Sequence, residues 1–111
     1  MIGIIKTWKH DDMTCVVRHS VFDAPCGYVK IPEGHALYKV NYFDYPYSVV
    51  LYVHEGITFS GELDGLQGWY VGFSMAHSGD FDPVDHTKCV RTGKECEQET
   101  SRLAEQIAEL K

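Results

Sequence analysis

The distribution of apolar and polar residues predicts short strands over the first ninety positions. Residues 2–8 and 14–18 are apolar and β-branched, and the polar sequence His10-Asp11-Asp12 between them suits a turn, so the pattern predicts a hairpin. Residues 26–31 have a proline on each side, which predicts a short third strand. Residues 31–47 mix proline, glycine and asparagine with aromatic residues, a composition typical of an ordered loop that packs through its own rings.

A second group of predicted strands follows this loop. Residues 47–53 are almost continuously apolar, which predicts a central strand covered on both faces. The sequence His54-Glu55-Gly56 then predicts a tight change of direction, because glycine tolerates positive φ, and residues 57–60 predict a short strand. After a glycine-rich loop at 61–68, residues 69–75 alternate in a way that places the large side chains of a strand on one face.

The C-terminal segment predicts one amphipathic helix over about 92–110. Thr92 and Glu95 match a capping box, in which each side chain satisfies an unpaired backbone N–H at the helix start. Five residues recur every three or four positions, which places them on one face of a helix: Cys96, Thr100, Leu103, Ile107 and Leu110. This face either packs on the chain's own sheet or forms a heptad seam with a second copy. We therefore expect a single α+β domain over 1–111, with a small, mostly antiparallel sheet and one C-terminal helix.

Composition excludes several classes of protein. Hydrophobic residues make up 44% and charged residues 23% of the 111, as in ordinary globular domains. The N-terminal segment is too short and polar for a signal peptide, and no apolar run approaches the roughly 20 residues of a membrane span, so we expect no membrane contact and a cytoplasmic location. The net charge of −6 argues against direct nucleic-acid binding.

Acidic residues and cysteines each allow two interpretations. In one interpretation the negative charge is the ordinary charge of a soluble protein's surface. In the other it forms one acidic face that meets a basic site on a nucleic-acid enzyme. The residues of that face would be Asp80, Asp82, Asp85, Glu95, Glu97 and Glu99. The cysteines contain no C-x-x-C pair and are expected to be reduced core groups, with a structural zinc site as the alternative: Cys15, Cys26, Cys89 and Cys96.

The histidines are the residues best placed for chemistry. His54 and His77 each follow a predicted long strand, and an up, down, up meander would bring both to the same edge of the sheet. With Asp80 they would then form a two-histidine, one-carboxylate site that suits zinc, iron or manganese. Alternatively, one histidine is a proton shuttle whose ring Asp80 or Glu55 orients. A third interpretation is that each histidine is a hydrogen-bonded packing residue at a strand end, and no cofactor is expected.

Aromatic rings around the loop at 31–47 suggest a binding surface. Rings that carry a hydroxyl suit either stacking on a purine base or anchoring a protein interface. The predicted ligand-binding residues, which suit a small anionic ligand such as a nucleotide, are Tyr28, His35, Tyr38, His54, Thr58, Trp69, His77 and Asp80. The sequence contains no nucleophile elbow, phosphate-binding glycine loop or H-E-x-x-H motif, so we expect a binding protein rather than an enzyme.

Five motifs in order resemble an uncharacterised family of small bacteriophage and prophage proteins over about four-fifths of the chain. They are Cys26-Gly27-Tyr28-Val29, Ile31-Pro32-Glu33-Gly34-His35, Val53-His54-Glu55-Gly56-Ile57-Thr58-Phe59-Ser60, Gly68-Trp69-Tyr70-Val71-Gly72-Phe73 and Ala76-His77-Ser78-Gly79-Asp80. The family pattern has glycine at the position of Glu55 and aspartate at that of Ser74. No activity follows from the resemblance.

The resemblance implies an accessory protein that acts on host machinery. The leading hypothesis is a stoichiometric inhibitor of a bacterial defence system, similar to anti-CRISPR proteins, that binds a host protein in the host-cell cytoplasm. The alternatives are a sponge that sequesters a signalling nucleotide and a metal-dependent hydrolase. We also expect a homodimer, because one helix leaves one face of so small a sheet poorly covered.

Overall fold

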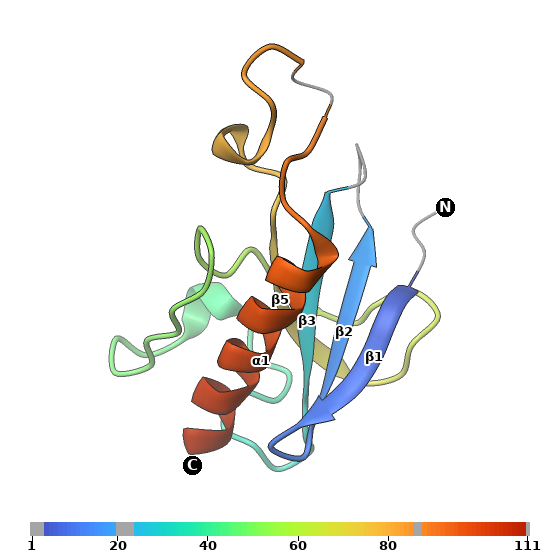
Figure 1. The fold of residues 1–111 in the computed structure, drawn as a ribbon. Helices are drawn as coiled ribbons and strands as arrows, with labels where there is room; N and C mark the ends of the chain where they lie inside the picture. The colour runs from blue at the N-terminus through green and yellow to red at the C-terminus, as the bar shows by residue number, and fades with distance from the viewer. Residues whose placement is uncertain (1–3, 20–23, 86–87, 111) are drawn as a thin grey trace.

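The computed structural model describes residues 4–19, 24–85 and 88–110. Within these ranges five antiparallel strands form one sheet in the spatial order β1-β2-β3-β5-β4 (Figure 1), with bounds β1 Ile4–His10, β2 Met13–His19, β3 Pro25–Ile31, β4 Phe59–Gly61 and β5 Trp69–Ser74. A 17-residue helix, α1 Gly93–Glu109, follows the sheet, and two short 3-10 turns, η2 Tyr42–Asp44 and η3 Ser78–Asp80, interrupt the loops. The predicted α+β fold is confirmed.

The N-terminal hairpin forms where the turn sequence predicts it. His10 pairs with Met13, so the connection contains only Asp11 and Asp12, whose φ angles are 52° and 62°. Two central residues with positive φ suit a two-residue hairpin turn, because its backbone twist matches that of the strands. The predicted strands are confirmed for the described residues, whereas positions 2 and 3 of the first one lie outside them. The third strand is confirmed as β3, which pairs with β2 and β5.

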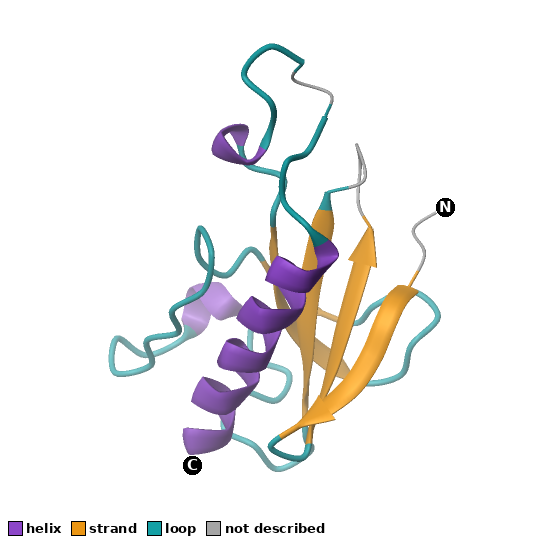
Figure 2. Ribbon diagram, in the orientation of Figure 1, coloured by secondary structure: helices purple, strands orange, loops and turns teal. Residues whose placement is uncertain are grey.

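Helix α1 covers one face of the sheet and contacts β1, β2 and β3 (Figure 2). Half of the predicted capping box is present: the Thr92 side chain accepts a hydrogen bond from the Glu95 backbone N–H at 3.1 Å, while the Glu95 carboxylate accepts from the Thr92 hydroxyl at 3.4 Å instead of from its backbone N–H. The apolar side of the helix is buried against the sheet through Cys96, Thr100, Leu103 and Ile107. The helix therefore packs on its own sheet, and the second-copy seam is wrong for these four residues.

The opposite face of the sheet has a smaller apolar cluster. Val16, Leu63 and Tyr70 are buried there, and Tyr28, Phe59 and Leu66 pack against them. Leu63 and Leu66 belong to the loop that follows β4, so this loop covers part of the face that α1 leaves open. The alternation predicted for residues 69–75 is confirmed, because Val71, Phe73 and Met75 are buried in the core under α1 while Tyr70 belongs to the opposite cluster.

Three of the four cysteines are core groups, as predicted, and Cys89 is not. Cys15, Cys26 and Cys96 are buried, Cys89 is half-buried, and all four are free thiols. In the described part of the chain, no group of three or more potential metal ligands includes a cysteine.

The prediction of a central strand at 47–53 is wrong. Val49, Leu51 and Val53 are partly buried against the core, but Tyr47 is fully exposed and Val50 and Tyr52 are 52% and 70% exposed. The segment has no strand partner within the described ranges; instead the Tyr52 backbone exchanges hydrogen bonds of 2.7 and 2.8 Å with the Gln106 side chain on α1. The apolar run thus lies along α1 with one side in solvent. The short strand predicted at 57–60 is confirmed in part, because β4 covers Phe59–Gly61 and leaves out Ile57 and Thr58.

Candidate functional site

Two loops meet beside the start of α1. His54 lies in a tight turn, which the Gly56 N–H closes by donating to the Val53 carbonyl at 3.0 Å, with φ of 60° at Glu55 and 85° at Gly56. The turn predicted at 54–56 is therefore confirmed. The His54 N–H donates to Glu99 Oε1 of α1 at 2.9 Å, which fixes this loop to the helix.

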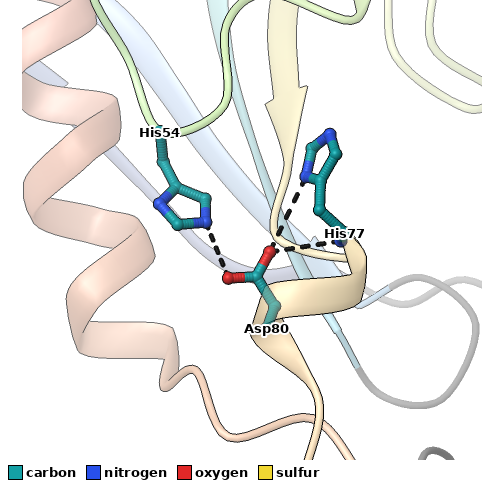
Figure 3. Close-up of side chains that lie close together, drawn as sticks. All are labelled: His54, His77 and Asp80. Atoms are coloured by element: carbon teal, nitrogen blue, oxygen red, sulfur yellow. Dashed lines mark hydrogen bonds and ion pairs between the residues drawn. The ribbon is translucent and has the colours of Figure 1, made fainter.

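The second loop follows β5 and carries His77 and Asp80, whose side chains face His54 (Figure 3). Asp80 Oδ1 lies 2.7 Å from His54 Nε2, and Asp80 Oδ2 lies 3.6 Å from His77 Nδ1 and accepts the His77 backbone N–H at 3.1 Å. The two imidazole centroids are 6.4 Å apart. The three predicted residues are thus brought together, but not by the predicted meander, because the segment before His54 is not a strand.

Arg91 completes the cluster, and the sequence interpretation missed it. Its Nε donates to Asp80 Oδ1 at 2.6 Å. The chain returns to Asp80 because Phe81 and Cys89 form a β-bridge and the Val90 N–H donates to the Asp80 carbonyl at 2.8 Å. No local pattern marks Arg91 as the partner of Asp80, because eleven residues separate the two and Lys88 is the first lysine or arginine after Asp80.

Asp80 is a buried carboxylate with a cationic partner. Its exposed fraction is 1%. Burial by itself would raise the pKa of this carboxyl, but hydrogen bonds from the Arg91 guanidinium, the His77 backbone and the His54 ring outweigh burial and hold the pKa below its usual range. An ionised carboxylate only accepts hydrogen bonds, so His54 Nε2 carries the proton between them.

The predicted acidic face is wrong as one surface. Asp80 is buried, and each of the three helical glutamates pairs with a different cation: Glu95 lies 3.7 Å from Arg91, Glu97 lies 2.8 Å from Lys6 and Glu99 lies 2.7 Å from Arg102. Glu95 and Glu99 are four residues apart and lie on one side of α1, whereas Glu97 lies on another side and pairs with Lys6 of β1, so the six residues do not form one free acidic surface.

His35 is remote from this cluster. Its Nε2 is 2.9 Å from the Ile107 carbonyl, and its Nδ1 accepts the Leu37 N–H at 3.1 Å. His54 is held by Glu99, and Ile107 lies eight residues after Glu99 in α1. The two helix residues are therefore about 12 Å apart along the helix axis. His35 therefore satisfies a carbonyl in the last turn of α1 and does not join His54 and His77.

The other predicted ligand residues are also dispersed. Trp69 begins β5 and His77 follows its end, so the strand separates them by roughly 20 Å. Tyr38 packs against the core with Trp69, and Tyr28 makes an edge-on contact with Phe59 at 5.5 Å on the opposite face. Thr58 is exposed and donates its N–H to the Gly72 carbonyl at 3.0 Å. Of the eight residues, only His54, His77 and Asp80 form a cluster.

A second feature is an exposed aromatic segment, which we call the aromatic arm and define as residues 42–52. It projects on the side of α1 away from β1, in green in Figure 1. Large apolar side chains face solvent along it: Phe43 (76% exposed), Tyr47 (104%), Val50 (52%) and Tyr52 (70%). Tyr45 packs against the core, and burial raises the pKa of Tyr45 to about 12. The aromatic arm is therefore anchored on one side and open on the other.

Comparison with known proteins gives no relative for this chain: no family model matches it, and no curated protein or solved structure is significantly similar to it. No helix among the described residues has the length and apolar character needed to cross a membrane.

Proposed function

We propose that this chain is a stoichiometric binding protein that attaches to a basic site on a host protein through the aromatic arm, and that it belongs to the class of phage accessory proteins that inhibit bacterial defence systems. Binding would take place in the host-cell cytoplasm. The observation that carries the proposal is the row of exposed apolar side chains on an anchored segment. The resemblance to small phage proteins gives the biological context.

The aromatic arm has the properties of an interface anchor. Contiguous exposed apolar surface is uncommon on soluble domains and often marks an interaction site. Tyrosine and phenylalanine supply large contact areas with few rotatable bonds, and tyrosine is enriched among the residues that dominate binding energy. A groove of about 370 Å³ runs along the arm, lined in part by Tyr42, Tyr45 and Ile57. Because the arm is already held by Gln106 and the core, less ordering entropy is lost when a partner binds.

The charge distribution supports a partner with a basic surface. Between Lys39 and Lys88 the sequence contains no lysine or arginine, and its seven acidic residues are Asp44, Glu55, Glu62, Asp64, Asp80, Asp82 and Asp85. Asp80 is neutralised by Arg91, whereas Asp44 lies within the aromatic arm and Glu55 lies three residues beyond its end, both exposed. A complementary partner has apolar pockets within a basic surface, as proteins that handle nucleic acid have.

The test uses matched serine substitutions. Val50→Ser lies in the aromatic arm and Val84→Ser, whose side chain is 93% exposed, lies outside it. The purified chain should capture one host protein at equal stoichiometry, and V50S combined with Tyr47→Ser should weaken the reconstituted complex by about 30-fold or more, the size of one hot-spot residue. V84S should bind as the unsubstituted chain does. Equal binding by all variants would remove the aromatic arm from the interface.

Inhibition is measured separately from binding. Expression of the chain should restore phage plating on a defence-proficient strain, and V50S combined with Y47S should fail to restore it. An isogenic strain without the defence system is the control, on which no variant changes plating. Restored plating by the arm variant would contradict the proposed mechanism of inhibition.

The alternative functions receive different support. The residues predicted to hold a nucleotide do not converge on one pocket, so no observation favours the sponge. The hydrolase requires a metal ion at His54, His77 and Asp80, and that requirement can be tested by itself.

A further inference from the structure

We propose that His54, His77 and Asp80 bind one divalent transition-metal ion, with zinc as the best fit. The inference is independent of the aromatic arm and of any protein partner.

The spacing of the three side chains suits a small coordination sphere. The candidate ligand atoms of His54, His77 and Asp80 all lie within 4.8 Å of one another. Zinc bonds of about 2.0–2.2 Å in a tetrahedral arrangement separate ligand atoms by about 3.4 Å. His77 Nδ1 and Asp80 Oδ2 are 3.6 Å apart, close to that separation. An ion therefore requires rotamer adjustments of side chains but no rebuilding of the backbone.

An unsatisfied nitrogen points into the cluster. His77 Nδ1 is buried and has no hydrogen-bond partner among the described residues. Its separation of 3.6 Å from Asp80 Oδ2 is too long for a hydrogen bond. A buried polar atom that lacks a partner lowers the stability of the fold, so such atoms are uncommon unless they have a role. A metal ion bonded to Nδ1 would satisfy this atom.

The donor set favours a transition metal over calcium or magnesium. Two imidazole nitrogens and one carboxylate suit zinc, iron and manganese, whereas calcium and magnesium select oxygen ligands. Binding would move the His54 proton from Nε2 to Nδ1, so that Nε2 offers its lone pair to the ion. The side chains of His54 and His77 are 20% and 34% exposed, so the cluster lies close to the surface of the molecule.

Surrounding groups hold the carboxylate in place. Arg91 Nε donates a hydrogen bond to Asp80 Oδ1. Asp80 Oδ2, the oxygen nearer His77, therefore remains for the ion. Ligating carboxylates are commonly oriented in this way by a hydrogen bond from outside the coordination sphere. Glu99 orients the backbone of His54 from α1. Once bound, the ion would join the His54 loop to the loop after β5.

Zinc binding is tested on the full chain, purified without a histidine tag, stripped with a chelator and dialysed. Isothermal titration with zinc chloride should give one ion per chain. The Tm should rise by roughly 10 °C at free zinc a hundredfold above Kd. Cobalt(II) should give visible absorption bands typical of a four- or five-coordinate ion with nitrogen ligands. Calcium and magnesium should leave the Tm unchanged.

Glutamine substitutions locate the ion. His77→Gln and His54→Gln should each weaken zinc binding by at least about 100-fold. His77→Gln is the decisive variant, because His77 Nδ1 makes no hydrogen bond with the described residues and the metal-free variant should therefore melt close to the parent chain. His10→Gln is the matched control, since His10 belongs to a second group of potential ligands, with Asp11 and Glu105. Zinc binding that H10Q abolishes, or that H77Q leaves unchanged, would overturn the proposal.

Discussion

At the scale of single residues, Gly27 controls how closely α1 approaches the sheet. A Cβ atom at this position would lie 2.0 Å from Thr100 Oγ1 on the helix and 2.7 Å from the Phe73 ring on β5. The Thr100 hydroxyl is itself fixed, because it donates to the Cys96 carbonyl at 2.7 Å. The absence of a side chain on β3 thus permits helix and strand to pack at this distance.

We expect Gly27→Ala to lower the free energy of unfolding by about 1–3 kcal/mol or more, because an added methyl group overpacks a full core. Chemical denaturation measures the change. Gly93→Ala is the control, since its Cβ would meet no atom within 4 Å, and it should change stability by less than about 0.5 kcal/mol. Equal stability of the two variants would show that the helix shifts freely on the sheet.

The thiols should differ in reactivity because they differ in burial. Burial raises the pKa of Cys15 to about 11 and that of Cys96 to about 12, and Cys26 is also buried. Only the thiolate reacts with a disulfide reagent, so these groups should be inert at pH 8. Ellman's reagent should label Cys89 quickly and the other three only after unfolding in guanidinium. Cys89→Ser should remove the fast phase, and a fast phase that persists would contradict this burial pattern.

At the scale of elements, the strands and the helix that are marked by a local sequence pattern were predictable. The hairpin follows from its turn residues, β5 from its alternation, and α1 from its spacing and its cap. Residues 47–53 were not predictable, because a run of apolar residues does not reveal whether its neighbour is a strand or a helix. Here the neighbour is Gln106, whose side chain takes the place of a strand backbone.

The candidate site, like the fold, could be predicted from the sequence only in part. His54 and His77 could be placed because each stands at the end of an apolar segment beside glycine. Arg91 could not be placed, since its contact with Asp80 depends on the return of the chain from Phe81 to Cys89, which no local pattern encodes.

The helix cap gives a prediction for α1. We expect Thr92→Ala to lower the free energy of unfolding by about 1 kcal/mol and the Tm by about 4 °C, because the Glu95 N–H loses its acceptor. Thermal unfolding followed by circular dichroism measures this change. Thr92→Ser keeps an acceptor and should stay within a few tenths of a kcal/mol of the parent chain. A Tm for T92A equal to that of T92S would mean that the cap adds nothing to stability.

At the scale of the whole molecule, α1 joins parts of the chain that are distant in sequence. Its buried side packs on β1, β2 and β3, its first turns hold the His54 loop through Glu99, and its last turns meet His35 and Tyr52. Because its apolar side is used within the chain, the predicted homodimer would need another surface. That homodimer remains a prediction.

The two hydrogen bonds between Tyr52 and Gln106 make the aromatic arm and the end of the helix mechanically continuous. Gln106→Ala should raise the hydrogen-exchange rate of the Tyr52 amide by roughly 5- to 30-fold, since one or two hydrogen bonds of about 1 kcal/mol each are lost. Gln98→Ala, at an exposed position on the same helix, should leave that rate unchanged. A force that a bound partner applies at Tyr47 would therefore be transmitted through Tyr52 and Gln106 to α1, and through α1 to the core, before the aromatic arm separates from the helix.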